Sequence, residues 1–210
     1  MISGKTVGRL SLYRRLLYGL REDGETSVFS RQLAAMAGGT AAQVRRDMMA
    51  IGYSGSPTRG YNIEELIRSI ASFLDAPEGQ HIALAGVGHL GLSILANFAG
   101  RRPKLSIVAA FDVDPAKVGR EIHGCPCYHI DQIAEVVREK NIDVGILTVS
   151  EALVHDVTDR FCHAGVRGLL NFTSSRLHVP KDVDVEDYDI AMCLEKVAYF
   201  ARQNGTRGQE

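Results

Sequence analysis

The chain has 210 residues, of which 45% are hydrophobic and 23% charged, with a formal net charge of -1. These fractions are those of ordinary globular proteins and exclude disorder and collagen-like repeats, while the length allows one domain or two small ones. No apolar stretch is long enough to span a membrane, and the chain does not begin like a signal peptide. Because 4 Cys are too few for a disulfide scaffold in a chain of this length, we expect a cytosolic protein with reduced thiols.

The small net charge hides an asymmetry between two parts of the chain. Residues 1–62 carry 9 Lys and Arg against 4 Asp and Glu, a net charge of +5. Residues 63–210 carry 15 against 21, a net charge of -6. A basic head on an acidic body is typical of a nucleic-acid-binding module joined to another domain.

Three helices are predicted in the basic head. Apolar residues at steps of three and four predict the first over residues 7–21. Ser30 is suited to cap a second helix, which two glycines end, and Thr40 is suited to cap a third over residues 41–49. A helix, a glycine-containing turn and a capped helix form the pattern of a helix-turn-helix, whose second helix can enter the major groove of DNA.

Polar residues of the third helix are candidates for contact with DNA. Gln43, Arg45 and Arg46 can bond bases or phosphates, as can Thr40 at the start of the helix. After this helix, glycines and a proline surround Arg59 in a hairpin-like tip, which has the composition of a wing aimed at a phosphate or the minor groove. The alternative is a small three-helix cap whose arginines are only solvated.

The acidic body begins with a helix over residues 63–74, which Asn62 caps with Glu65 at the capping-box position. A linker follows at residues 76–79. A short apolar strand over residues 81–85 then runs into the string GVGHLG, and an apolar helix follows. A second apolar strand ends at Asp112. A GxGxxG string between a strand and a helix, with an acid at the end of the next strand, is the dinucleotide-binding fingerprint.

The residue types of this fingerprint explain its chemistry. Gly86 permits the tight turn, Gly88 lets the backbone approach a pyrophosphate, and Gly91 lets helix and strand pack closely. The helix N-terminus offers N–H groups to the phosphates. Asp112 can bond a ribose 2′-hydroxyl and would repel a 2′-phosphate, which favours NAD(H) over NADP(H). A turn of this kind without a nucleotide, or one that binds CoA, is the alternative.

Helices and strands continue to alternate after Asp112. We predict helices over residues 130–140 and 151–164 and strands over residues 144–149 and 169–172. This order gives a doubly wound parallel sheet, an α/β fold, with its ligand at the carboxyl ends of the strands. The sequence predicts a loop and then a last helix over residues 189–203, which is apolar enough to require burial on its own sheet or on a second subunit.

A short segment with two Cys and two His could indicate a metal, but its spacing does not. Cys125 and Cys127 are separated by one residue, which is not the spacing of structural zinc, and no second Cys pair follows nearby. We therefore expect these two residues to be apolar parts of a short strand and expect no metal site.

Longer strings of the chain point to one family. They are Gln43–Asp47, Thr58–Gly60, Gly86–Gly91, Phe111–Gly119, Ile146–Val149, Gly168–Phe172 and Tyr188–Asp189. On these residues the chain resembles the Rex redox-sensing transcriptional repressors over nearly its whole length. The strings FDVDPAKVG and QVRRD are much more specific than GxGxxG alone.

The resemblance implies a domain organisation and a function. It implies a winged-helix DNA-binding domain over residues 1–78, a Rossmann NAD(H)-binding domain over 79–186, and a dimerisation helix with its tail, exchanged between subunits, over 187–210. The protein would be a cytoplasmic homodimer and not an enzyme. It would sense the NADH/NAD⁺ ratio and would be released from an inverted-repeat operator in double-stranded DNA when NADH binds.

The resemblance also assigns roles to residues. Gln43, Arg45 and Arg46 would lie at the major groove, with Arg9 and Arg59 on the backbone or in the minor groove. The cofactor-binding residues would be Gly86, Val87, Gly88, His89, Leu90, Gly91, Asp112, Lys117, Thr148, Val149, Asn171 and Phe172, the last four on the nicotinamide side. His89 stands where some members have an Arg that pairs with the Asp matching Asp189. A His89–Asp189 pair would couple the sensor to the dimer and respond to pH.

Departures from the family pattern cluster at the wing and at the nicotinamide side. The wing ends in Arg59-Gly60-Tyr61, two residues shorter than the usual string, and Asn97 stands where Tyr is usual. Ser150 and the pair Thr173-Ser174 also depart from the usual strings.

Two other functions fit parts of the sequence. One is an NAD-dependent oxidoreductase with an N-terminal oligomerisation module, in which His89 or His123 would be the acid–base candidate. The other is a scaffold that binds CoA or a nucleotide without binding DNA. The sequence shows no acid–base pair beside an obvious substrate pocket, and the nucleotide-binding part is short for a dehydrogenase with a substrate domain, which favours the sensor.

Overall fold

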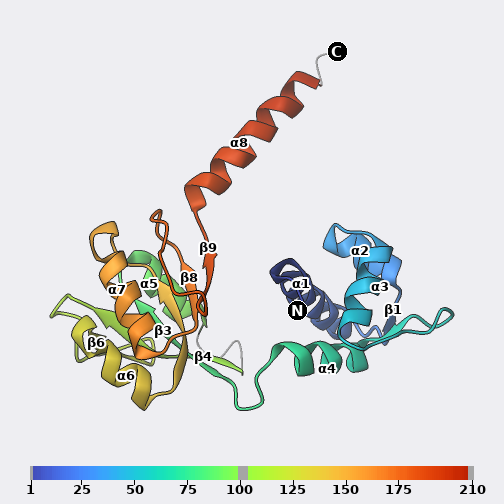
Figure 1. Cartoon of the computed structure of the whole chain (residues 1–210). Coiled ribbons are helices and arrows are strands. Elements are labelled where there is room, and N and C mark those ends of the chain that lie inside the picture. The colour runs from blue at the N-terminus through green and yellow to red at the C-terminus, as the bar shows by residue number, and fades with distance from the viewer. Residues whose placement is uncertain (1, 99–103, 208–210) are drawn as a thin grey trace. The chain divides into compact units, whose positions relative to one another are not determined.

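The computed structural model describes residues 2–98 and 104–207. The chain divides into two compact units, residues 1–77 and residues 78–210. Figure 1 shows the helices and strands of both units in chain order.

The first unit is mainly helical. Its elements are α1 (Gly4–Glu22), β1 (Ser27–Val28), α2 (Ser30–Ala37), α3 (Ala41–Ala50), β2 (Tyr61–Asn62) and α4 (Ile63–Leu74). Apolar residues at steps of three and four on α1, among them Leu10, Tyr13 and Leu17, are buried in a core that they share with α2, α3 and α4. β1 and β2 pair antiparallel and close the base of the wing, the loop between α3 and β2.

One predicted helix cap of this unit is wrong and another is confirmed. Phe29, not Ser30, is the N-cap of α2, and its backbone N–H donates to the Gln32 side chain at 2.9 Å. Asn62 caps α4 as predicted, since its Oδ1 accepts from the Glu65 backbone N–H at 3.0 Å, and the Glu65 carboxylate accepts from the Tyr53 hydroxyl at 3.1 Å.

The second unit is a layered α/β domain. Its elements are β3 (Gln80–Ala85), α5 (His89–Phe98), β4 (Leu105–Asp112), β5 (Glu121–Ile122), β6 (Cys125–His129), the 3-10 helix η1 (Ile130–Gln132), α6 (Ile133–Glu139), β7 (Ile142–Leu147), α7 (Glu151–Ala164), β8 (Gly168–Asn171), β9 (Asp184–Asp187) and α8 (Ile190–Arg207). The seven strands form one sheet in the order β5-β6-β4-β3-β7-β8-β9, parallel except for β5.

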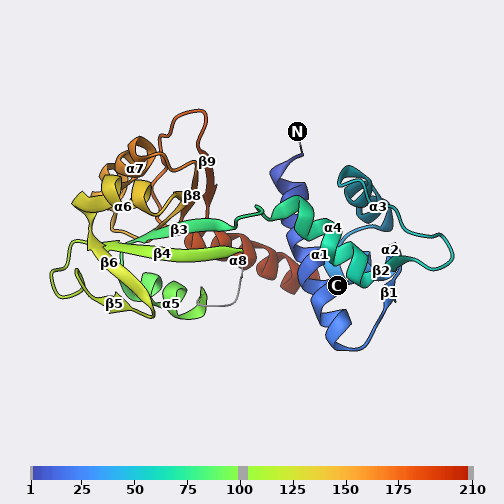
Figure 2. The same ribbon diagram turned by 90° about the horizontal axis from the view of Figure 1, so that it is seen from below.

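Helices cover both faces of this sheet, as Figure 2 shows, with α5 on one face and α6 and α7 on the other. Side chains of β3 alternate between the two layers: Ile82 and Leu84 pack with the residues of α5, and Ala83 and Ala85 pack with those of α6 and α7. The doubly wound parallel sheet predicted from the sequence is confirmed.

Two differences from the predicted strands bear on the site. β7 ends at Leu147, so Thr148 and Val149 follow the strand and stand at its carboxyl edge. β9 lies in a segment predicted to be a loop. It is an edge strand with exposed Asp and Glu side chains, and because it buries almost nothing it lacks the apolar alternation that marks a strand.

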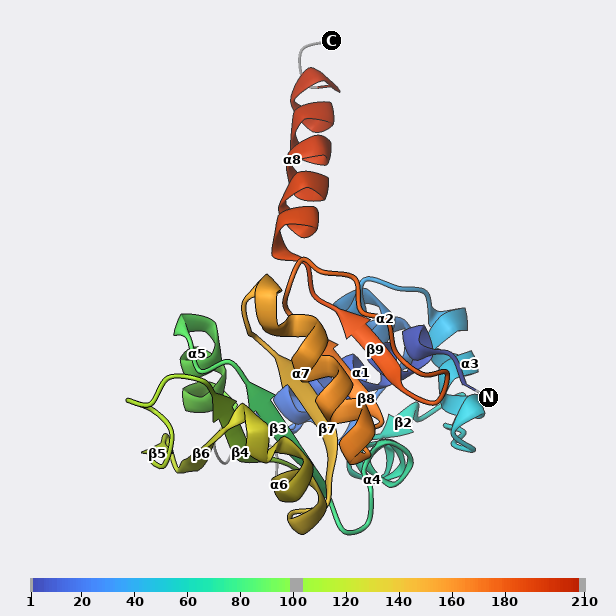
Figure 3. The same cartoon turned by 60° about the vertical axis from the view of Figure 1, so that its left-hand side comes forward.

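The last helix, α8, follows β9 directly (Figure 3). Asp189 caps it, since its carboxylate accepts from the Met192 backbone N–H at 3.0 Å. Its large apolar side chains are between 50% and 66% exposed: Ile190, Met192, Leu194, Val197, Tyr199 and Phe200. In the ranges that the structure describes, no helix has the length and apolar character needed to cross a membrane.

Candidate nucleotide-binding site and nucleic-acid interface

A cavity of about 220 Å³ lies at the carboxyl edge of the sheet in the second unit. It is lined by Gly86, Gly88, Asp112, Val113, Lys117, Ile130, Thr148, Val149, Ser150 and Leu153. These residues follow β3, β4, β6 and β7, which is where parallel sheets bind their ligands. The cavity has room for only part of a dinucleotide.

Each glycine of the GxGxxG turn has its own steric reason. Gly86 has φ 95°, and a Cβ there would lie 2.5 Å from the Thr148 carbonyl oxygen. A Cβ on Gly91 would collide with the Gly86 carbonyl oxygen, so only glycine lets α5 start this close to β3. Gly88 faces open space, with nothing within 4 Å of an added Cβ. The turn therefore leaves an uncovered backbone surface at the start of α5 that fits a pyrophosphate.

Thr148 holds this turn from the neighbouring strand end. Its hydroxyl lies 2.7 Å from the Gly86 carbonyl oxygen and 3.0 Å from that of Ala85. This contact fixes the Gly86 turn against β7, so Thr148 shapes the cavity that it also lines.

The Asp112 side chain joins the turn to the end of β4. Its Oδ2 accepts from the Val87 backbone N–H at 2.8 Å and from Lys117 Nζ at 3.2 Å, and its Oδ1 accepts from the Asp114 backbone N–H at 2.9 Å. A carboxylate has about four acceptor positions, so Oδ1 retains one, and Asp112 lines the cavity. That position fits a ribose hydroxyl.

The charge of Asp112 is secured by these bonds. Burial raises the pKa of the carboxyl group, but the N–H donors of Asp114 and Val87 and the Lys117 ammonium outweigh it and lower the pKa below its usual value. Asp112 is therefore a carboxylate at neutral pH. A fixed negative charge here disfavours a phosphate on the adenosine ribose.

The remaining predicted cofactor residues fall into three groups. Val87 and Gly91 are buried in the turn, while His89 and Leu90 are exposed on α5. Asn171 and Phe172 are not among the described residues that line the cavity. The predicted set lacks Val113, Ile130, Ser150 and Leu153. Ile130 comes directly after β6, so an accurate strand prediction would have placed it at this edge.

Asp189 and His89 do not pair within the chain. The contacts found among the described residues place the Asp189 carboxylate on the Met192 N–H, where it caps α8. His89 starts α5 at the cavity edge. The predicted pair stays a prediction for the dimer.

In the first unit, α3 presents one face outward. Val44, Asp47 and Met48 are buried. Ala42, Arg46 and Met49 follow one another at steps of four and three and lie opposite that buried side. Arg46 is thus the cation at the centre of the exposed face.

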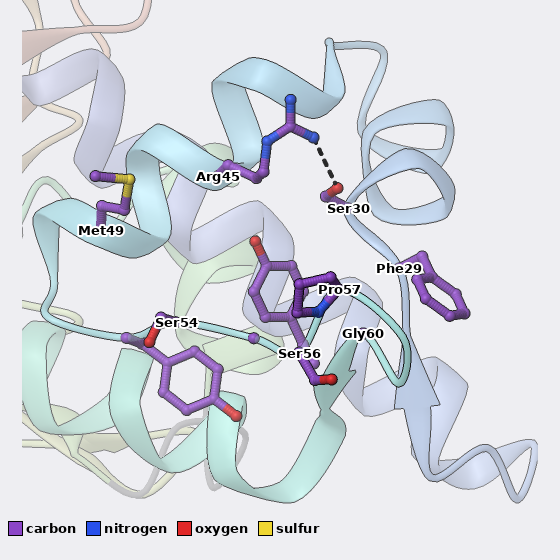
Figure 4. A pocket seen from close by; sticks show the side chains of 11 residues that line it. Phe29, Ser30, Arg45, Met49, Ser54, Ser56, Pro57 and Gly60 are labelled. Atoms are coloured by element: carbon purple, nitrogen blue, oxygen red, sulfur yellow. Dashed lines mark hydrogen bonds between the residues drawn. The ribbon is translucent and has the colours of Figure 1, made fainter.

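Arg45 lies to one side of that face. Its Nη1 donates to the Ser30 hydroxyl at 3.2 Å and points toward the start of α2 (Figure 4). It lines a cavity of about 410 Å³ between α2, α3 and the wing, whose walls include Phe29, Met49 and Pro57. Arg59 is exposed on the wing itself.

Arg9, a predicted DNA contact, is held inside its own unit. Its guanidinium donates twice to the Asp47 carboxylate, both bonds 2.7 Å long, and the Tyr13 hydroxyl donates to the same group at 3.1 Å. The Arg9 side chain is 27% exposed and that of Asp47 4%. Burial is the largest of the causes that raise the pKa of Tyr13 to about 12. Arg9 therefore fixes α3 against α1, which leaves little of it for DNA.

Cys125 and Cys127 are buried in the core beside α5. Burial raises their pKa values to about 12 and about 11, so both thiols stay protonated at neutral pH. Over residues 2–98 and 104–207, no group of three or more His, Cys, Asp or Glu is arranged to hold a metal ion.

The fold and the two sites define a class of protein, in which a winged helix precedes a Rossmann domain. A family model for the N-terminus of putative DNA-binding proteins matches residues 1–48, and one for a CoA binding domain matches residues 78–175. The chain belongs to the Rex family of redox-sensing transcriptional repressors. It is 38% identical to the Rex repressor of Anoxybacillus flavithermus over 95% of this chain and 94% of that one. It is 39% identical to that of a Geobacillus species over 93% and 90%.

Solved structures give the same relationship. The Rex-family repressor RSP matches 100% of this chain and 99% of its own, with 26% identity and a TM-score of 0.89. RSP in complex with NADH matches with 25% identity and a TM-score of 0.86, and its complex with NAD⁺ and operator DNA with 26% and 0.89. The resemblance to Rex is therefore confirmed in sequence and in fold.

Proposed function

We propose that this chain is a redox-sensing transcriptional repressor that binds an inverted-repeat operator as a homodimer and leaves it when NADH binds. The observation that carries the proposal is the presence, in one chain, of a glycine cradle facing the Asp112 carboxylate and a helix that presents Arg46 beside a wing. The relative RSP, solved with NADH and with NAD⁺ plus operator DNA, supports both halves.

The dinucleotide would lie across the carboxyl edge of the sheet. The pyrophosphate would meet the backbone at Gly88 and the N-terminus of α5, and the adenosine ribose would donate to Asp112. When bound, the cofactor supplies a nicotinamide ring that is positively charged in NAD⁺ and neutral in NADH. The Asp112 charge favours NAD(H) over CoA, because the ribose of CoA carries a 3′-phosphate.

Contacts with DNA would be shared among three elements of the first unit. Arg46, at the centre of the exposed face of α3, would read a base in the major groove. Arg45 would meet a phosphate near the start of α2, and Arg59 would meet a phosphate or the minor groove from the wing. Thr40 and Gln43 flank the start of α3 and would add backbone or base contacts.

The dimer would form through α8. Six large apolar side chains exposed on one helix are more than a soluble protein leaves uncovered, so we assign residues 187–210 to dimerisation. A dimer also gives the two reading heads that an inverted repeat requires.

The chain would act in the cytoplasm, with its DNA, and would not turn over a substrate. The ionisable side chains that line the nucleotide cavity, Asp112 and Lys117, are paired with each other at 3.2 Å. That pair serves binding, and it leaves the described part of the cavity without a proton donor and acceptor for catalysis.

The proposal is tested by binding to DNA from upstream of the protein's own gene at fixed salt, measured by fluorescence anisotropy. We expect tight binding without ligand and with NAD⁺, and release by NADH. Specific DNA binding that ignores NADH would contradict the sensor, and an absence of specific binding under all three conditions would contradict the repressor.

A further inference from the structure

Asn171 occupies a special place at the end of β8. It is 1% exposed, and it stands in parallel register with Asp187, the last residue of β9. The loop that follows it begins with Phe172 and Thr173, on the predicted nicotinamide side, and α8 begins three residues after Asp187. Asn171 therefore lies between the expected cofactor and the dimerisation helix.

All four hydrogen-bonding positions of the Asn171 carboxamide are used inside the protein. Its Oδ1 accepts from the backbone N–H of Thr173 at 3.0 Å and from the Thr173 hydroxyl at 2.7 Å. Its Nδ2 donates to the Ser175 carbonyl oxygen at 3.0 Å and to Asp187 Oδ1 at 2.8 Å. An amide has two donors and two lone pairs, so this side chain has nothing left to offer a nicotinamide.

The bonds join two segments that are far apart in sequence. One end of the carboxamide holds the Thr173 loop, and the other end holds Asp187. The Tyr188 N–H also donates to the Asn171 carbonyl oxygen at 2.8 Å, and the Tyr188 and Phe172 rings lie 5.6 Å apart. The next residue, Asp189, caps α8. Short contacts centred on the buried Asn171 side chain thus link the loop to the start of α8.

The same loop is tied to the nucleotide cavity. The Ser174 hydroxyl donates to the carboxylate of Glu151, the first residue of α7. Glu151 directly follows Val149 and Ser150, which line the cavity. The contacts therefore run without a gap from the cavity wall to the dimerisation helix.

We propose that Asn171 is a positioning residue that couples the nicotinamide side of the cavity to α8 through Asp187, rather than a residue that touches the cofactor. The inference rests on the proposed function. It also assigns a coupling route to a chain that has His89 and Asn97 at two positions where the family pattern has other residues.

The first test removes only the hydrogen bond between Asn171 and Asp187. Asp187 is exposed, so Asp187→Ala leaves the core intact while it deletes the acceptor of Asn171 Nδ2. Asp184→Ala, the same change at the amino end of the same strand, is the matched control. Operator affinity is measured with and without saturating NADH, and NADH affinity is measured without DNA.

Coupling energies in proteins change affinity by about 5–150-fold, and we expect NADH to weaken operator binding by such a factor in the wild type and in Asp184→Ala. In Asp187→Ala the factor falls to about twofold or less, while NADH affinity without DNA stays within about threefold of wild type. If the wild type releases DNA and Asp187→Ala releases it by the same factor, the coupling role is wrong and the proposed function stands. If the wild type itself ignores NADH, the proposed function fails and the inference falls with it.

A second pair of variants tests the bond itself. Asn171→Asp keeps the acceptor for Thr173 but places a carboxylate against Asp187, so coupling is lost. Adding Asp187→Asn restores a donor and an acceptor between positions 171 and 187, in reversed positions. Both variants lack the bond to the Ser175 carbonyl oxygen, so the comparison between them isolates the bond to residue 187. Recovery of the NADH effect to within about threefold of wild type supports the inference, whereas a double variant as uncoupled as Asn171→Asp contradicts it. A shift in melting temperature alone would not reproduce this pattern.

Discussion

Asp112 carries the dinucleotide assignment at the scale of single residues. Its carboxylate is charged and has an acceptor position that the bonds within the protein do not use. A hydrogen bond to a charged group contributes about 1.5–3 kcal/mol. Asp112→Ala should weaken NADH binding by about 10–100-fold, measured by titration of NADH fluorescence. Asp114→Ala is the control, because it removes a carboxylate 3.5 Å from Lys117 that does not line the cavity. Equal affinity in the wild type and Asp112→Ala would show that the ribose is bound elsewhere.

Arg46 and Arg45 should separate base reading from phosphate contact. Arg46→Ala should cost about 1–3 kcal/mol on the operator and much less on unrelated DNA, because it removes a base contact. Arg45→Ala should weaken binding about equally on both duplexes and reduce the salt dependence. If Arg45→Ala instead lost specificity and Arg46→Ala weakened binding to both duplexes equally, Arg45 would read the base and Arg46 would contact the phosphate.

Arg9 should act on stability before it acts on DNA. Arg9→Ala leaves the Asp47 carboxylate buried with one neutral donor, Tyr13, in place of a bidentate cation. Breaking a fully buried pair costs 3–5 kcal/mol, and the partial exposure of Arg9 reduces the expected loss to about 2 kcal/mol in the free energy of unfolding. Urea unfolding measures it. If Arg9→Ala has unchanged stability but binds DNA weakly, the prediction is wrong and Arg9 contacts DNA.

At the scale of elements, α8 is the feature that a single chain leaves incomplete. Leu194→Asp places a charge in the apolar stripe of α8 and should weaken the dimer by about a hundredfold or more, since each subunit loses the burial of one Leu. Sedimentation velocity would show monomer at micromolar concentration. Gln203→Asp, which adds the same charge on the side of α8 opposite Leu194, one heptad after Lys196, should stay dimeric. A dimeric Leu194→Asp would place the interface outside α8.

The elements also show which parts of the fold follow from sequence. The helix α7 begins and ends as predicted over residues 151–164, because its apolar spacing and the following Gly165 (φ 111°) are local signals. The glycine turn and Asp112 are predictable for the same reason. β9 is not, because an exposed edge strand is held by its neighbour β8 and not by its own pattern.

Roles within the sites are harder to predict than positions. The sequence places Arg9 and Asn171 in the two sites, yet the structure gives both side chains internal partners, Asp47 for Arg9 and Thr173 and Asp187 for Asn171. Asp47 and Asp187 are distant in sequence from the residues that they bind, whereas Thr173 lies only two residues after Asn171. Only the packed chain shows that these two residues hold other parts in place.

At the scale of the whole molecule, the two oppositely charged parts of the chain correspond to the two proposed binding functions. The net charge of +5 lies on residues 1–62, within the unit that carries α3 and the wing, and the acidic remainder contains the cavity that takes the dinucleotide. Because one basic head carries only a modest charge, we expect dimerisation, which supplies two heads, to raise the affinity for DNA. DNA binding should also weaken steeply with salt.

Linkage tests the central claim, that dinucleotide and operator bind to one coupled protein, most directly. If NADH lowers operator affinity by some factor, operator DNA must lower NADH affinity by the same factor. We therefore propose titrating NADH, at fixed salt, into the wild-type protein alone and into its complex with the upstream duplex. Equal factors in the two directions, each well above one, are the predicted result. An NADH affinity that is the same with and without bound operator would contradict it.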